Sequence, residues 1–194
     1  MQGMAAGNQD RTGELRISLE QLLVVQDEEA ADDYRDNHVR RMSGSILLAS
    51  GEPENGVKIG EVELIYFGGS RAVDNGLDIL DVADSVGEEA YRYAKAVYAG
   101  GVLNRDLVTE PMSNDLLAVS SVTILPEYRG HEYGMRGVRK ITETVGYHCG
   151  AVVMRSEDRL GAAPEIIAEE EPGYGGLAGF LPTNDPSVLL VVSY

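Results

Sequence analysis

The run Ser121-Val122-Thr123-Ile124-Leu125-Pro126-Glu127-Tyr128-Arg129-Gly130-His131-Glu132-Tyr133-Gly134-Met135-Arg136 is the most informative part of this 194-residue chain. It begins as an apolar strand, stops at a proline, passes through a glycine-bearing turn and enters a helix. Backbone N–H groups of such a turn, joined to the positive end of the helix, hold a pyrophosphate without a dedicated charged side chain. Glycines let the ligand approach closely. The run predicts an anion-binding turn; the alternative is an ordinary strand–turn–helix with incidental glycines.

This run resembles the central motif of the GNAT superfamily, in which a strand and often a proline precede Arg/Gln-x-x-Gly-x-Gly/Ala and a helix. Arg129 and Gly134 match the first and last motif positions. Glu132 stands where the family usually has its middle glycine, and a carboxylate there crowds or repels a pyrophosphate. A second, shorter match is Leu177-Ala178-Gly179-Phe180, which resembles the Gly-Phe corner after the family's fourth helix.

The resemblance implies an N-acetyltransferase that moves an acetyl group from acetyl-CoA, its cosubstrate, to a primary amine of a small molecule or protein. Direct attack of the amine is the family's usual route. Val122 and Ile124 are implied to hydrogen-bond the pantetheine arm. The implied pyrophosphate-binding residues are Arg129, Gly130, His131, Glu132, Tyr133, Gly134, Met135 and Arg136. The alternative is a GNAT-fold binding or interaction module without transfer activity, which the Glu132 departure favours. A homodimer is expected by family analogy alone.

The catalytic acid is less well marked. In the family it is often a tyrosine four residues before the glycine of the Gly-Phe corner, a position held here by Gly175. Tyr174 is one residue away, and one residue turns a helical side chain by about 100°. Tyr174 is therefore the candidate acid, or else a packing or surface tyrosine. The base stays open among turn and strand residues: Glu110, Asp115, Ser120 and Ser121.

Neither the cysteine nor the histidines form a recognisable catalytic or metal-binding spacing. The lone Cys149 is expected to be a packing thiol, with an acyl-accepting nucleophile as the alternative. His131 either touches phosphate or is an exposed loop side chain. His38 and His148 have no ligand spacing with each other or with Cys149, so no metal is expected.

The charge balance excludes some partners. With 32 Asp and Glu against 16 Lys and Arg, the formal net charge is −16, which repels nucleic acid and anionic lipid. The negative charge favours a cationic acceptor or a basic protein tail as partner; the alternative is that the charge serves only solubility. A further alternative is an acidic decoy, which blocks a nucleic-acid-binding protein by charge mimicry. No apolar run approaches the roughly 20 residues of a membrane span, and residues 1–12 lack a secretory signal pattern, so a cytoplasmic location is expected.

The pattern along the chain predicts an α/β (α+β) fold. We expect a flexible leader over residues 1–12 and one GNAT-like domain over residues 13–194. The domain should contain a mixed, mostly antiparallel sheet of six or seven strands flanked by helices, splayed where the central strand meets residues 151–154. The expected strands are 14–25, 45–49, 57–67, 116–125, 151–154 and 187–192, and the expected helices lie within 27–42, 77–99 with a break at Gly87, 135–145 and 165–171. Residues 68–76 and 173–179 are expected to be loops.

Overall fold

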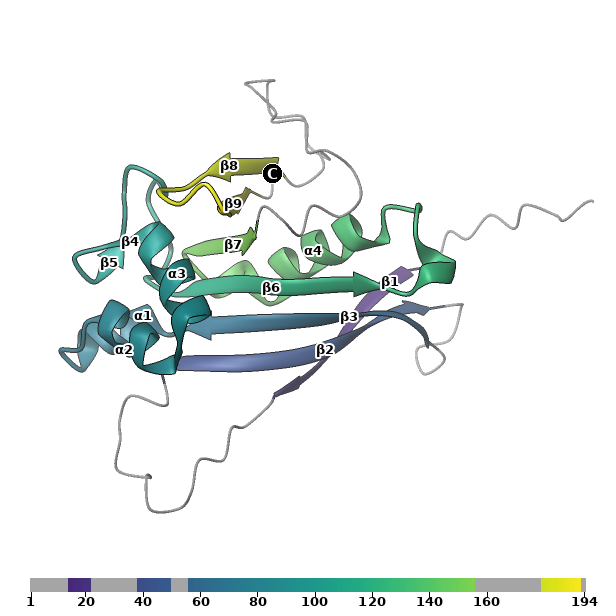
Figure 1. Ribbon diagram of the computed structural model, residues 1–194, viewed down its shortest axis with the longest axis horizontal. Helices are drawn as coiled ribbons and strands as arrows, with labels where there is room; N and C mark the ends of the chain where they lie inside the picture. Colours follow the sequence, from purple (N-terminus) through teal and green to yellow (C-terminus); the bar gives the residue numbers. More distant parts are fainter. Residues whose placement is uncertain (1–13, 22–37, 50–55, 156–178, 193–194) are drawn as a thin grey trace, which may run out of the picture.

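A computed structural model describes residues 14–21, 38–49, 56–155 and 179–192. They build a seven-stranded sheet in the order β1-β2-β3-β6-β7-β9-β8 (Figure 1). Its strands are β1 Glu14–Gln21, β2 Val39–Ala49, β3 Gly56–Phe67, β6 Leu116–Ile124, β7 Ala151–Arg155, β8 Gly179–Pro182 and β9 Val188–Val192. Only the β6–β7 pair is parallel. The prediction of a mixed, mostly antiparallel sheet flanked by helices is confirmed.

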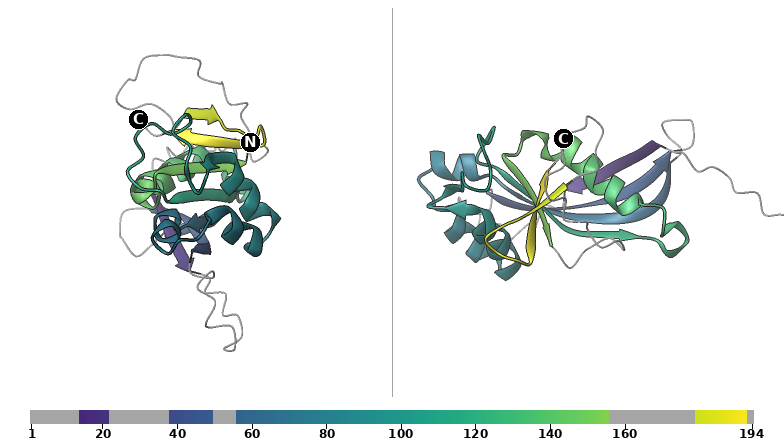
Figure 2. Two further views of the ribbon diagram at one scale, coloured as in Figure 1. Left: turned by 90° about the vertical axis from the view of Figure 1, so that its left-hand side faces the viewer. Right: turned by 90° about the horizontal axis from the view of Figure 1, so that it is seen from above.

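Helices cover both faces of this sheet. They are α1 Gly69–Asp74, α2 Ile79–Val86, α3 Glu88–Val97 and α4 Tyr133–Thr144, with 3-10 turns at Pro126–Tyr128 and Gly146–His148 and a small ribbon of β4 Tyr98–Ala99 and β5 Val102–Leu103. Tyr93 of α3 packs with Ala118 of β6, whereas Ile141 of α4 packs with Leu117 and Val119. Successive strand residues face opposite sides, so α3 and α4 lie on opposite faces of β6, as seen from above in Figure 2.

The break between α2 and α3 falls at Gly87, as predicted. Gly87 has φ 137°, a backbone conformation that favours glycine, and it ends one helix while it begins the next. The Asp78 carboxylate caps the start of α2 by accepting a hydrogen bond of 2.9 Å from the Leu80 N–H. Local sequence signals therefore suffice to predict where α2 ends and α3 begins.

Two predictions are wrong in the described residues. Val39 to Met42 do not end a helix: they belong to β2 and pair with β3, and Met42 also pairs with Gln21 of β1, so sheet pairing overrides their helical spacing. Residues 68–76 are not only loop, because α1 forms there; the Asp115 carboxylate accepts a 2.9 Å hydrogen bond from the Ser70 N–H at its first turn. The strand proposed for 22–25, most of the helix at 27–42, the helix at 165–171, residues 173–178 and Tyr174 lie outside the described residues.

Candidate functional site

The turn after β6 is tightly hydrogen-bonded and carries the chain directly into α4. The Leu125 N–H donates to the Ile59 carbonyl over 2.9 Å, and the Tyr128 N–H donates to the Leu125 carbonyl over 2.9 Å. The side-chain Nε of Arg129 donates to the Ile124 carbonyl over 3.0 Å. Gly130 follows with φ 81°. These bonds hold the end of β6 beside the start of α4, as the sequence pattern predicts.

The first turn of α4 offers backbone donors for an anion. The helix begins at Tyr133, two residues earlier than predicted, so Gly134 and Met135 lie in its first turn. Their N–H groups have no acceptor within the helix, because the first four N–H groups of any α-helix lack one. The N-cap residue Glu132 makes no side-chain capping hydrogen bond. Buried Tyr133 packs with Ile46 and Ile59, which fixes this helix end on the sheet.

Side chains around this turn carry charges of both signs: Glu127 and Glu132 bring carboxylates, and Arg129 and Arg136 bring guanidinium groups. Residues 129–140 contain four cationic side chains and a single carboxylate, that of Glu132, in a chain with net charge −16. The four are Arg129, Arg136, Arg139 and Lys140. The positive end of the α4 dipole adds to the same field. This turn is therefore suited to phosphate oxygens.

Glu132 adopts a left-handed backbone conformation, with φ 57° and ψ 13°. Among the described residues, Glu132 and Glu110 are the two non-glycine residues with positive φ. The left-handed region costs a residue with a Cβ atom roughly 1–2 kcal/mol. The backbone here has the shape for which glycine is the usual residue, and glycine is what the GNAT motif has at this position. The exposed carboxylate lies at the helix end where an anion would bind.

Beyond Val119, the edge of β6 that faces β7 has no strand partner among the described residues, and it leads to the turn. The described pairing of β6 with β7 runs from Leu116 to Val119, and Arg155 at the end of β7 pairs with Val188 of β9 on the other edge of β7. On the other edge of β6, Val119 pairs with Leu64 and Ser121 pairs with Glu63, so Ser120 is the extra residue of a β-bulge. Ser120 therefore lies just beyond the described β6–β7 pairing. Val122 and Ile124 lie on the open stretch, with their side chains packed against the apolar cluster of Tyr133.

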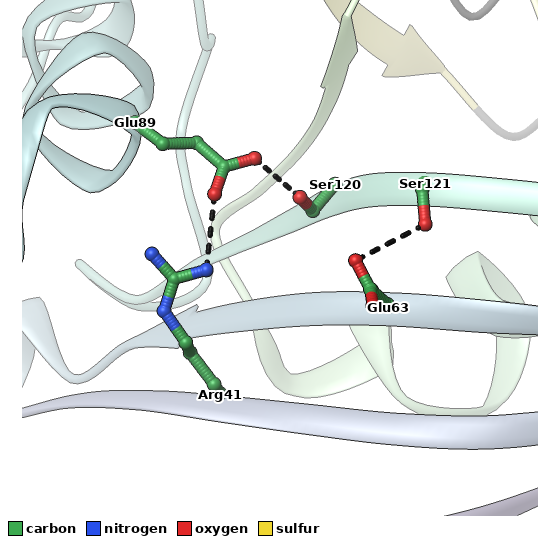
Figure 3. Close-up of polar contacts among 5 residues, drawn as sticks. All are labelled: Arg41, Glu63, Glu89, Ser120 and Ser121. Carbon is green, nitrogen blue, oxygen red and sulfur yellow. Dashed lines mark hydrogen bonds and ion pairs between the residues drawn. The ribbon is translucent and has the colours of Figure 1, made fainter.

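A polar network surrounds the bulge (Figure 3). Glu89, in the first turn of α3, accepts a hydrogen bond from the Ser120 hydroxyl and another of 3.0 Å from the Arg41 guanidinium of β2. Partial burial raises the pKa of Glu89, but these hydrogen bonds and the charges of Arg41 and Arg155 outweigh that effect and lower it. Glu89 is therefore ionised at neutral pH. One residue along, the Ser121 hydroxyl donates to Glu63 over 3.3 Å.

Sequence reasoning missed Glu89. Glu88 and Glu89 open a helix, where acidic residues usually serve only the helix dipole. Their spacing from Ser120 carries no signal, since the two elements meet only through sheet packing. Serines 120 and 121 were among the open choices for a base, and the structure places both at the bulge.

Other candidate residues lie elsewhere or serve packing. The Asp115 carboxylate accepts hydrogen bonds from the Tyr66 hydroxyl at 2.8 Å and from the Ser70 N–H at 2.9 Å, at the end of β6 remote from the turn. Glu110 is exposed in the loop before it. His131 is exposed, with its ring centroid 5.7 Å from that of Tyr133. The Arg136 guanidinium lies 5.5 Å from the centroid of the same ring.

Cys149 has the properties of a packing thiol. It is partly exposed as a residue, and burial of its sulfur, helped by the Asp115 carboxylate, raises the thiol pKa to about 12. The thiolate is the nucleophilic form of cysteine, so Cys149 is unreactive at neutral pH. Within the described residues, no three His, Cys, Asp or Glu side chains are grouped so that they could hold a metal ion.

Comparisons with family profiles, with curated proteins and with solved structures gave no significant match. None of the helices in the described part of the chain is both long and apolar enough to cross a membrane.

Proposed function

We propose that this protein is an N-acetyltransferase of the GNAT type, which transfers an acetyl group from acetyl-CoA to a primary amine. The observation that carries the proposal is the continuous path from the bulge at Ser120, along the open edge of β6, to the N-terminus of α4. A ligand with a long amide-bearing arm and a pyrophosphate at one end matches this path.

The dimensions of the path support an acyl-CoA. Ser120 to Ile124 spans about 13 Å at the usual rise of a strand, which is comparable to much of an extended pantetheine arm. Backbone groups at the open edge are suited to the amides of the arm, and the N–H groups of Gly134 and Met135 to the pyrophosphate. The thioester then lies beside Ser120, the bulged residue.

The transfer step needs little covalent chemistry from the protein. A neutral amine nitrogen attacks the thioester carbonyl carbon, the C–N bond forms and the C–S bond breaks. The proton lost from nitrogen balances the proton taken up by the departing thiolate. Ser120 has no strand-pairing partner on β3 or on β7 in the described ladder, so its N–H can polarise the thioester carbonyl. The protonated thiol of Cys149 agrees with direct attack.

The acceptor class follows from charge. A net charge of −16 attracts amines, which are ammonium ions in solution, and raises their local concentration at low ionic strength. The proposal therefore takes a cationic small molecule or a lysine-bearing chain as acceptor, and no nucleic acid or membrane.

The second candidate is a GNAT-fold binding module without transfer activity. The exposed carboxylate of Glu132 favours it, since that side chain is at the helix end that a pyrophosphate would occupy. A carboxylate there lowers the affinity for an anion by repulsion.

Isothermal titration with acetyl-CoA, together with a thiol-release assay over a panel of primary amines, tests both candidates. Binding with release of free CoA supports the transferase. Binding without release for every amine supports the binding module. Absence of heat at millimolar acetyl-CoA contradicts both.

A further inference from the structure

The described contact between α3 and the sheet is largely apolar. Ala90, Tyr93, Ala94 and Val97 of α3 are buried in a single hydrophobic cluster with β3 and β6. Glu89 adds a charged group: its side chain, 33% exposed, reaches the hydroxyl of Ser120, which is 7% exposed as a residue. A carboxylate that close to a core costs free energy unless it is paired. Arg41 and Ser120 provide that pairing.

This network joins three elements at the bulge. Glu89 belongs to α3, Arg41 to β2 and Ser120 to β6. In the chain, Arg41 is 48 residues from Glu89 and Ser120 is 31 residues from it. The bulged residue has no described ladder partner on either edge of its strand. Strand pairing alone therefore leaves the orientation of Ser120 poorly determined. The hydrogen bond to Glu89 supplies the missing constraint.

We propose that Glu89 is a positioning residue for acyl transfer, which holds the β6 backbone at Ser120 against the thioester carbonyl through the Ser120 hydroxyl. This inference rests on the proposed acetyl-CoA-dependent function. Glu89 acts through Ser120 and does not touch the substrate. Its ion pair with Arg41 holds the carboxylate in the orientation that the Ser120 hydroxyl requires.

The neighbouring Ser121–Glu63 pair is a matched control. It has the same chemistry one residue further along β6, with a distance of 3.3 Å. Glu63 and Ser121 are already partners in the β3–β6 ladder, so their side-chain contact adds no constraint that the backbone lacks. Glu63→Ala should therefore leave the carbonyl environment unchanged.

The test uses isotope-edited infrared spectroscopy of acetyl-CoA labelled with carbon-13 at the carbonyl, bound to the full-length protein. Polarisation by the bulge N–H lowers the C=O stretching frequency below its value in water. Ser120→Ala and Glu89→Ala should each abolish this shift, and the double variant should do no more, because the two residues act as one unit. Ser120→Thr should retain the shift, since its hydroxyl still reaches Glu89.

Titration of the same variants with acetyl-CoA should give dissociation constants close to that of the wild type, because the pyrophosphate turn is untouched. With any amine that turns over, kcat should fall about 10- to 100-fold, which is what a small misplacement of reacting groups costs, while KM for acetyl-CoA stays constant. Circular dichroism verifies folding, and Glu89→Leu, which also lacks an acceptor for the Ser120 hydroxyl, replaces Glu89→Ala if the latter does not fold.

The outcomes separate the two proposals. Tight binding by the wild type with an unaltered carbonyl shift in the folded Glu89 variants overturns the positioning role and leaves the transferase intact. A loss of shift in Glu63→Ala equal to that in Glu89→Ala also overturns it. Failure of the wild type to bind acetyl-CoA overturns the proposed function, and this inference with it.

Discussion

Glu132 shows how one backbone angle and one charge act at the same position. Its φ of 57° is a conformation that glycine adopts without cost, and its carboxylate is exposed at the positive end of α4. The side chain opposes anion binding, while the backbone around it has the shape of an anion-binding turn. Replacing this residue separates the two effects.

Glu132→Gly should both stabilise the protein and tighten acetyl-CoA binding. Relief of left-handed strain, about 1 kcal/mol, should raise Tm by roughly 2–4 °C for a chain of this size. Removing the carboxylate should lower the Kd for acetyl-CoA about two- to fivefold, as for a charge at a helix end. Glu110→Gly is the matched control, because Glu110 shares the left-handed backbone, with φ 50°, but lies in another loop. It should raise Tm without changing Kd, and equal Kd changes in both variants would contradict the site.

Gly134→Asp should abolish acetyl-CoA binding, because it adds bulk and negative charge to the first turn of α4 next to the proposed pyrophosphate. Gly134→Ala adds a methyl group without charge and keeps helix propensity high. It should therefore fold well and bind more weakly than the wild type but more tightly than the Asp variant. Titration calorimetry measures the affinities, and circular dichroism verifies the helix content. Unchanged affinity in Gly134→Asp and in Glu132→Gly together would sink the assignment of this turn.

At the scale of elements, Asp115 joins three segments at the start of β6. Its carboxylate accepts from the Tyr66 hydroxyl of β3 and from the Ser70 N–H of α1. Its carbonyl accepts from the Gly150 N–H over 2.8 Å, just before β7. The residue therefore holds the end of β6 that lies away from the proposed cofactor turn, and its role is structural.

Asp115→Ala should lower the free energy of unfolding by about 2–4 kcal/mol, because two hydrogen bonds to a charged acceptor are lost. Tyr66→Phe, which removes only one of them, should cost about half as much. Urea denaturation followed by circular dichroism measures both. Glu143→Ala is the control: it removes an exposed ion pair with Arg139, at 2.8 Å, worth only about 0.3–0.5 kcal/mol. Acetyl-CoA affinity at low temperature should stay unchanged in Asp115→Ala, whereas a selective loss of affinity would place Asp115 in the site.

At the scale of the whole molecule, two buried or half-buried groups couple stability to pH in the same direction. Burial, together with the charges of Arg71 and Arg40, lowers the pKa of His38, which is fully buried. The pKa of Glu89 is lowered by its hydrogen bonds and by Arg41 and Arg155, against the effect of burial. In both cases the unfolded chain takes up a proton first as the pH falls.

The free energy of unfolding should therefore fall in two stages on acidification. The His38 contribution is complete above the unfolded value of about 6.5, and that of Glu89 above about 4.3; each is lost as the pH falls through the lower folded pKa. Urea denaturation at several pH values from about 8 down to about 2, below the usual pKa of a glutamate, measures both stages. His38→Gln should remove the first stage only. The difference in the free energy of unfolding between this variant and the wild type should therefore change with pH below about 6.5. A constant difference would contradict the role of His38.

The sequence alone determined the elements whose causes are local. Gly87 predicts the break between α2 and α3, and Pro126 with Gly130 and Gly134 predicts the turn from β6 into α4. Alternation of apolar residues predicts β3, β6 and β7 to within a residue or two. Their backbone preferences and apolar periodicity act over a few residues, so they can be read without a partner.

Tertiary structure decided whatever depends on residues distant in the chain. Val39 to Met42 became strand because β3 pairs with all four residues, and α1 formed where Asp115 accepts from Ser70. Glu89 entered the candidate site only because α3 packs over the bulge of β6. Sheet pairing and side-chain contacts between elements contribute free energy that no local pattern encodes. For this reason the sequence predicts the turn proposed to bind the cofactor but gives no sign of Glu89 beside it.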